Sequence, residues 1–145
     1  MFRISAENSA PSLLDAYAGI VDPSALDTLS RFCLIEKWSA DLDNAVLNLG
    51  EAASRFHGLD PRSGRFGLLE FVRCYDPRAA HDIIALFEQA AARERPFHYS
   101  AELRSATREK RIVHCFGDFG KLHGERATAG LDGVFLLSRT SFVES

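Results

Sequence analysis

Apolar residues gather into five short runs that predict strands, two near the start of the folded region and three near its end. The first run covers residues 33–42, and Asp43-Asn44 forms a turn before a second run over residues 45–49, which is the pattern of a β-hairpin. Three further runs cover residues 97–105, 111–119 and 127–138. The short connections between these last runs predict an antiparallel meander.

Between the two groups of strands, apolar residues recur at intervals of three and four, as on one face of a helix. The clearest helix begins at Asp76-Pro77, an N-cap followed by a first-turn proline, and runs to about Glu94. A second helix is predicted over residues 24–32, ahead of the first strand, and a short one over residues 51–56. The chain therefore combines an antiparallel sheet with a helical layer.

This order of elements predicts an α+β fold, with a five-stranded antiparallel sheet and helices on one face. We expect one domain over residues 33–140, preceded by a segment over residues 1–32 that holds the first helix, and followed by a tail over residues 141–145. The space between helices and sheet is a natural place for a ligand pocket. Residues expected to line it are Phe56, Leu69, Phe71, Ile83, Phe87, Tyr99, Val113 and Cys115. Plain core packing is the other interpretation of the same residues.

The last three strands lack the apolar–polar alternation of a sheet with one solvated face. Adjacent side chains of a strand point to opposite faces, yet apolar residues follow one another directly in residues 112–116 and 134–137. Because burying one large apolar side chain contributes about 1.5–3 kcal/mol, the second face requires a cover. We predict two covers, a cap formed by the helix at residues 24–32 and a second copy of the chain in a homodimer. The cap and dimer face comprises Leu26, Leu29, Phe32, Ile112, Phe116, Val134 and Leu136.

Composition narrows the class of protein further. The 145 residues are 46% hydrophobic and 26% charged, which suits one globular domain. Seventeen Lys and Arg against 20 Asp and Glu give a net charge of −3 without a basic stripe, so nucleic acid is not an expected partner. The sequence shows neither a secretory signal nor an apolar run long enough to enter a bilayer, and its three cysteines form no CxxC pair. We expect a cytoplasmic protein without a metal site or membrane insertion.

Several short motifs follow one another in an order that is typical of one family. Residues 38–42 read Trp-Ser-Ala-Asp-Leu, residues 51–61 form a short helix ending in Gly-Leu-Asp-Pro, residues 95–97 read Arg-Pro-Phe, and residues 131–134 read Leu-Asp-Gly-Val. Together they resemble the PAS domain family, in the subgroup with a first-strand Trp and a Pro-Phe opening the third strand. The resemblance covers residues 33–140 and implies the PAS fold with a role in sensing or protein–protein contact.

Two family features are missing from the chain. The hairpin at residues 107–109 lacks the usual glycine, and Leu-Ser-Arg-Thr stands at residues 137–140 where the family has Asp-(Ile/Val)-Thr before an effector. No kinase, helix-turn-helix or cyclase sequence follows. We therefore expect a stand-alone regulator that docks onto a signalling protein such as a histidine kinase or another regulator. The alternatives are a PAS sensor of haem or a small metabolite, and the sensor segment of a larger histidine kinase.

Candidate chemistry is sparse. His81 is the candidate axial ligand of a haem, because the resemblance places that ligand in the long helix, although His81 lies at the edge of the apolar face. Flavin photochemistry requires a reactive cysteine, and residues 63–66, Ser-Gly-Arg-Phe, hold none where the family places it. No hydrolase, zinc-protease, phosphate-loop or dinucleotide motif is present. We expect no catalytic residues and, apart from the haem or metabolite alternative, no cofactor.

Overall fold

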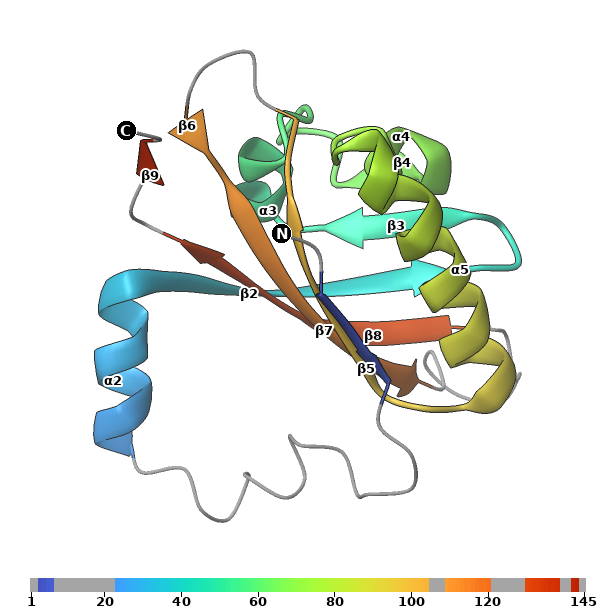
Figure 1. The fold of residues 1–145 in the computed structure, drawn as a ribbon, viewed down its shortest axis with the longest axis horizontal. Coiled ribbons are helices and arrows are strands. Elements are labelled where there is room, and N and C mark those ends of the chain that lie inside the picture. The colour runs from blue at the N-terminus through green and yellow to red at the C-terminus, as the bar shows by residue number, and fades with distance from the viewer. Residues whose placement is uncertain (1–2, 7–22, 105–108, 121–129, 139–141, 144–145) are drawn as a thin grey trace.

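The structure, a computed structural model, describes residues 3–6, 23–104, 109–120, 130–138 and 142–143, and it is an α+β fold (Figure 1). Its helices are α2 (Pro23–Phe32), α3 (Glu51–Phe56), α4 (Leu68–Val72) and α5 (Pro77–Arg93). Its strands are β1 (Arg3–Ala6), β2 (Cys33–Asp41), β3 (Val46–Leu49), β4 (Arg65–Gly67), β5 (Phe97–Glu102), β6 (Glu109–Lys110), β7 (Ile112–Gly120), β8 (Gly130–Ser138) and β9 (Phe142–Val143). No helix within these ranges is both long and apolar enough to cross a membrane.

The main sheet is antiparallel and has the strand order β1-β5-β7-β8-β2-β3-β4. The five predicted strands are present as β2, β3, β5, β7 and β8, but the predicted count of five is wrong because β1 and β4 extend the sheet to seven strands. Both additions are edge strands of three or four residues, too short to show an apolar alternation. β6 and β9 pair separately, so the predicted tail contains a strand. Residues 105 and 127–129 of the predicted strands, and the turns at 107–108 and 139–140, lie outside the described residues.

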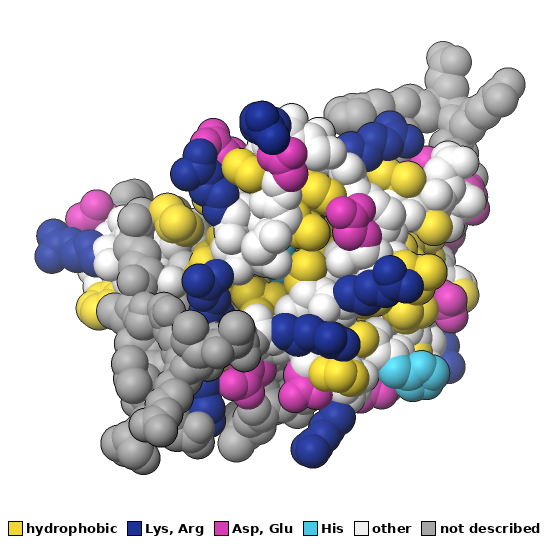
Figure 2. All heavy atoms as spheres, turned by 90° about the horizontal axis from the view of Figure 1, so that it is seen from above, with side chains coloured by type: hydrophobic (Ala, Val, Ile, Leu, Met, Phe, Trp, Pro, Cys, Tyr) yellow, Lys and Arg dark blue, Asp and Glu magenta, His cyan; other side chains and the backbone are white. Residues whose placement is uncertain are grey.

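Helices α3, α4 and α5 cover one face of the sheet, which we call the inner face (Figure 1). The sequence explains the bounds of α5: the Asp76 side chain accepts a hydrogen bond from the Arg78 backbone N–H at 2.9 Å, and Pro77 occupies the first turn. The helix ends at Glu94, whose φ of 52° is left-handed. Seen from the helical side, basic, acidic and apolar side chains are interspersed over the surface (Figure 2).

The two faces of the central strands both carry apolar side chains, as predicted. Val113, Cys115, Phe135 and Leu137 are fully buried on the inner face. Their neighbours Ile112, Phe116, Val134 and Leu136 alternate with them and are partly buried on the opposite, outer face. These outer residues, together with Ile35 of β2, are called the outer patch.

Helix α2 is present where the apolar spacing predicts it, but it does not cap the sheet. It runs from the start of β2 at one end of the sheet, on the side opposite α3, α4 and α5 (Figure 1), with Leu26 49% and Phe32 59% exposed. The reason lies in the connection: α2 ends at Phe32 and β2 begins at Cys33, so no loop allows the helix to turn back. The predicted cap is therefore wrong for this structure, and the apolar stripe of α2, formed by Leu26, Leu29 and Phe32, lacks the sheet as a cover.

A buried polar chain in the aromatic core as candidate functional site

The space between the sheet and helices α3–α5 is filled by aromatic rings. Trp38 of β2 stacks on Phe87 of α5 at a centroid distance of 5.6 Å and lies 5.7 Å from Phe135 of β8. The remaining rings of this aromatic core are His57, Phe71, Tyr75, Phe97 and Tyr99. Ring pairs at these distances contribute about 0.5–1.5 kcal/mol each beyond the area that they bury. The core is thus packed through its aromatic side chains, with α5 as one wall and β8 as the other.

A chain of polar side chains crosses this core. His57 Nδ1 lies 2.6 Å from the Ala53 carbonyl oxygen, and His57 Nε2 lies 2.7 Å from the Tyr75 hydroxyl. The Tyr75 hydroxyl lies 2.9 Å from the Tyr99 hydroxyl. Cys115, directly opposite Tyr99 in the β5–β7 register, also interacts with that hydroxyl. This polar chain of His57, Tyr75, Tyr99 and Cys115 connects α3 to the inner face of the sheet, and all four side chains are buried.

One end of the chain fixes the position of its protons. A carbonyl oxygen only accepts hydrogen bonds, so His57 Nδ1 carries the proton that it donates to Ala53. In a neutral imidazole the other nitrogen is then an acceptor, and the Tyr75 hydroxyl donates to it. The Tyr75 oxygen accepts in turn from the Tyr99 hydroxyl. Hydrogen-bond donation along the polar chain therefore runs in a single direction, from Tyr99 to Tyr75 and from Tyr75 to His57.

Each member comes from a different element. His57 is the C-cap residue of α3, one turn after Ala53, and its ring lies 5.3 Å from the Phe135 ring of β8. Tyr75 lies between α4 and α5, where it forms an isolated bridge with Leu103 and its carbonyl accepts a hydrogen bond from Arg104 Nε at 3.0 Å. Tyr99 belongs to β5 and Cys115 to β7. Displacement of any one element therefore breaks the chain.

Burial keeps all four groups uncharged at neutral pH. Removal from water lowers the pKa of His57 to about 4, against the opposing effect of its bond to Ala53. The same cause raises the pKa of Tyr75, Tyr99 and Cys115 well above their usual values. For Cys115 burial is the largest effect, and it keeps the thiol protonated. A protonated thiol is a poor nucleophile, so the arrangement suits recognition or stability rather than covalent catalysis.

Two glycines make room for Trp38 at the floor of the core. Gly117 of β7 and Gly133 of β8 pair directly, and Gly133 also pairs with Trp38. A Cβ on Gly117 would lie 2.5 Å from Phe97 Cζ and 2.8 Å from Trp38 Cζ2. Trp38 Nε1 is buried without a hydrogen-bond acceptor among the described residues, since Cys115 lies outside hydrogen-bond geometry. Among the buried side chains of the described residues, this N–H is the one donor that a polar ligand atom would satisfy.

The structure places the predicted pocket residues as follows. Six of them, Phe71, Ile83, Phe87, Tyr99, Val113 and Cys115, are fully buried between helices and sheet. Phe56 is partly buried, with the Arg111 guanidinium 5.8 Å from its ring centroid. Leu69 is 60% exposed on α4, so its predicted place in a pocket is wrong. A residue two positions before the buried Phe71 lies about 200° around a helix and points away from the core.

His81 is exposed on α5 and has no part in the aromatic core. The exposure of His81 therefore gives no support to the haem alternative at this position. The histidine that the fold does bury is His57, which the sequence does not single out, because α3 has only six residues and shows little periodicity. The i, i+4 spacing of Ala53 and His57 was the available signal, since both lie on the buried side of α3.

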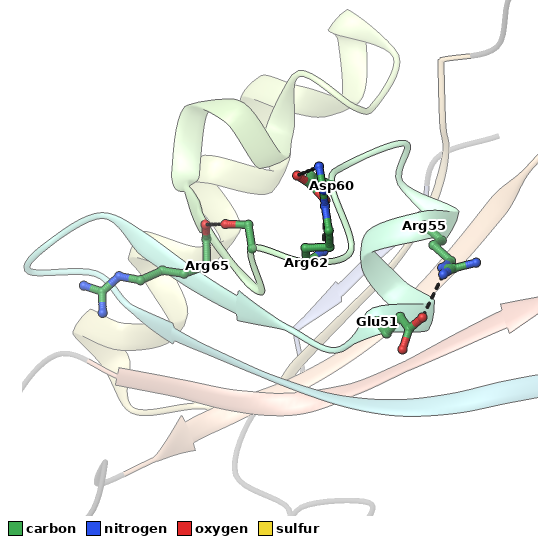
Figure 3. Close-up of polar contacts among 6 residues, drawn as sticks. Glu51, Arg55, Asp60, Arg62 and Arg65 are labelled. Atoms are coloured by element: carbon green, nitrogen blue, oxygen red, sulfur yellow. Dashed lines mark hydrogen bonds and ion pairs between the residues drawn. The ribbon is translucent and has the colours of Figure 1, made fainter.

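Polar contacts near the site hold the segment between α3 and β4 (Figure 3). Glu51 and Arg55 form an ion pair at 2.8 Å within α3, and Asp60 binds Arg62 at 3.1 Å. Ser63 Oγ donates to the Arg65 carbonyl at 2.9 Å. The Arg62 side chain, followed by its backbone N–H, lowers the pKa of Asp60. All of these groups are exposed, where such pairs add little stability, and their charges are locally balanced rather than gathered into a binding patch.

Comparison with known proteins assigns no family. No family model matches the chain, and no curated protein matches it significantly.

Proposed function

We propose that the chain is a PAS-type regulatory domain that acts through protein–protein contact. Three motifs far apart in the sequence support the PAS assignment by meeting in the core. The first-strand residue Trp38 pairs with Gly133 of the closing-strand motif, and its ring lies 6.1 Å from Phe97 of the Pro-Phe motif. The α+β arrangement with helices on one sheet face is compatible with the fold that this family implies.

The observation that carries the proposed role is the apolar surface left on the far side of the molecule. The outer patch lies opposite the helical layer, and Ile35 within it is 45% exposed. Leu26, Phe32 and Ile35 make up three of the four large hydrophobic residues exposed within the described part of the chain, and they lie on the consecutive elements α2 and β2. A concentration of such side chains marks a surface that another protein covers.

The partner that best fits this surface is a second copy of the chain. The α2 stripe runs from Leu26 to Phe32, and six residue steps of a helix span about 9 Å. The outer patch lies on the neighbouring strands β7, β8 and β2, which span roughly 10 Å at the usual strand spacing. The α2 stripe of one protomer thus matches the width of the outer patch of another, and both are apolar. A signalling protein such as a histidine kinase would use the same surface in a heterologous complex.

Sedimentation velocity with a matched control tests the homodimer. The variant Leu26→Ser/Phe32→Ser removes two exposed apolar side chains of α2 without touching the core. Leu69→Ser removes an equally exposed leucine from the helical side. We expect wild type and Leu69→Ser to dimerise in a concentration-dependent manner, and Leu26→Ser/Phe32→Ser to remain monomeric. A wild type that stays monomeric at high concentration, or a double serine variant that dimerises normally, contradicts the proposal.

A second candidate function, binding of a small polar metabolite in the aromatic core, is favoured by the unsatisfied Trp38 Nε1 donor. Native mass spectrometry of the purified protein tests it, because a resident ligand adds a discrete mass. We expect such an adduct to be lost in Trp38→Phe, which removes the Nε1 donor and keeps an aromatic ring in the core. A wild-type spectrum with the bare mass, after purification from cells and after incubation with a cell metabolite extract, counts against this function.

A further inference from the structure

Two histidines lie on adjacent rungs of the outer face, on strands β5 and β7. His98 pairs with Phe116, and His114 pairs with Ser100. These residues alternate with the buried Tyr99 and Cys115, so all four lie on the side opposite the helices. The His98 and Phe116 rings stack at a centroid distance of 5.7 Å, and His114 Nδ1 lies 2.6 Å from Ser100 Oγ. Both imidazoles are held in place by neighbours on the sheet.

The histidines border the outer patch directly. His114 pairs across to Leu136 of β8, and Phe116, on which His98 stacks, pairs with Val134. Both imidazoles are partly buried beside these apolar side chains. A protein that covers the outer patch would therefore cover the histidines as well.

Charged groups on the surrounding strands lie near the two imidazoles but are not paired with them in register. On β5, Glu102 lies one outer-face rung beyond Ser100 and pairs with Ile112. Asp118 of β7 and Asp132 of β8 pair with each other, one outer-face rung beyond Phe116. Lys37 of β2 pairs with Val134, and Arg3 of β1 pairs with Ser100. The register thus places no carboxylate directly opposite either histidine.

The surroundings favour the neutral imidazole at His114. Partial burial lowers the pKa of His114, and the nearby His98 lowers it further when it is charged. The imidazole of His114 is therefore neutral at neutral pH, and its protonation on acidification adds positive charge to this part of the outer face.

On the basis of the homodimer proposed above, we propose that protonation of His98 and His114 dissociates the dimer. An imidazolium covered by the apolar α2 stripe loses its hydration, and within its own sheet no carboxylate pairs with it in register. The one carboxylate of α2, Asp27, is ion-paired with Arg31. Neutral imidazoles have no such penalty and add packing area beside Phe116. The outer face then binds its partner copy at neutral pH and releases it in mild acid.

The size of the effect follows from proton linkage. An imidazole with the ordinary pKa of about 6.5 is roughly tenfold more protonated than neutral at pH 5.5. Each histidine that must be neutral for docking then weakens the dimer by up to about tenfold at that pH. Four such groups occur per dimer, and the lowered pKa of His114 reduces its share. We expect the dimer Kd to rise at least about tenfold between pH 7.5 and 5.5.

Sedimentation velocity at pH 7.5 and 5.5 measures this change in wild type, in His98→Gln/His114→Gln and in His81→Gln. His81 is the control because it is exposed on α5, on the other side of the sheet. We expect His81→Gln to weaken with acid as wild type does, and the double glutamine variant to keep its Kd within about threefold. Circular dichroism at both pH values confirms that each sample is folded.

The outcomes separate this inference from the proposed function. A wild type that is monomeric at pH 7.5 overturns both the homodimer and its dissociation by protonation of the histidines. A dimer that forms at pH 7.5 and keeps its Kd at pH 5.5 overturns only the dissociation by protonation. Equal acid weakening of wild type and His98→Gln/His114→Gln also overturns it, because other groups would then carry the effect.

Discussion

Acid should destabilise the fold through His57, and the structure sets the size of the effect. Burial lowers the pKa of His57 from 6.5 to about 4, so the unfolded chain binds the proton more tightly than the folded one. The stabilisation is complete above pH 6.5 and is lost as the pH falls towards 4. A difference of about 2.5 pKa units corresponds to about 3 kcal/mol, of which about 2 kcal/mol is already lost at pH 5. This is a large part of the 5–15 kcal/mol that is typical of a domain.

Urea unfolding at a series of pH values, followed by Trp38 fluorescence, measures this loss. Trp38 is the single tryptophan of the chain and lies in the aromatic core, so its emission reports directly on the region that His57 occupies. The measurement is made in the Leu26→Ser/Phe32→Ser background, so that self-association does not contribute to the free energy of unfolding.

His57→Gln removes the titrating group, and His81→Gln removes an exposed one as a control. At pH 7 we expect His57→Gln to cost about 1–3 kcal/mol, since Tyr75 and the Ala53 carbonyl lose their partner. Between pH 7 and pH 5, the reference protein and His81→Gln should each lose about 2 kcal/mol more than His57→Gln. Equal losses in the reference protein and His57→Gln would refute the argument, because they would show that His57 does not titrate differently in the folded state.

Two further substitutions test the packing and the capping inferred above. Gly117→Ala should lower the free energy of unfolding by about 1–3 kcal/mol, because its Cβ meets Phe97 and Trp38. Gly67→Ala is the control and should change stability little, because its Cβ has no atom within 4 Å. Thermal unfolding compares the two variants, and equal melting temperatures contradict the packing argument. Asp76→Ala should lower the free energy of unfolding by about 1 kcal/mol, because the Arg78 backbone N–H loses its capping acceptor. Glu88→Ala, exposed within the same helix, should lower it by less than about 0.5 kcal/mol. Urea unfolding measures both, and an unchanged stability of Asp76→Ala would show that the cap adds none.

The sequence allowed the long elements to be predicted, together with β3 and α3, and missed the other short ones. The strands β2, β5, β7 and β8 each have six to nine residues, enough for a pattern to be recognised. β1, β4 and α4 have three to five, and the misplaced Leu69 belongs to one of these short elements. The buried polar chain was harder still, because its members come from α3, the α4–α5 connection, β5 and β7. Only the folded chain shows that Tyr75 and Tyr99, 24 residues apart, share a hydrogen bond.

The error over α2 shows what an apolar pattern can and cannot specify. The stripe of α2 and the outer patch each indicate a surface that needs a cover, and this much is a matter of composition and spacing. Whether one surface covers the other within a protomer depends on the chain between them, and the direct junction of Phe32 with Cys33 prevents it. Between two protomers the restriction disappears, since each α2 can then reach the outer patch of its partner. A two-fold arrangement satisfies both surfaces of both copies at once, which is the physical reason for proposing self-association before any other partner.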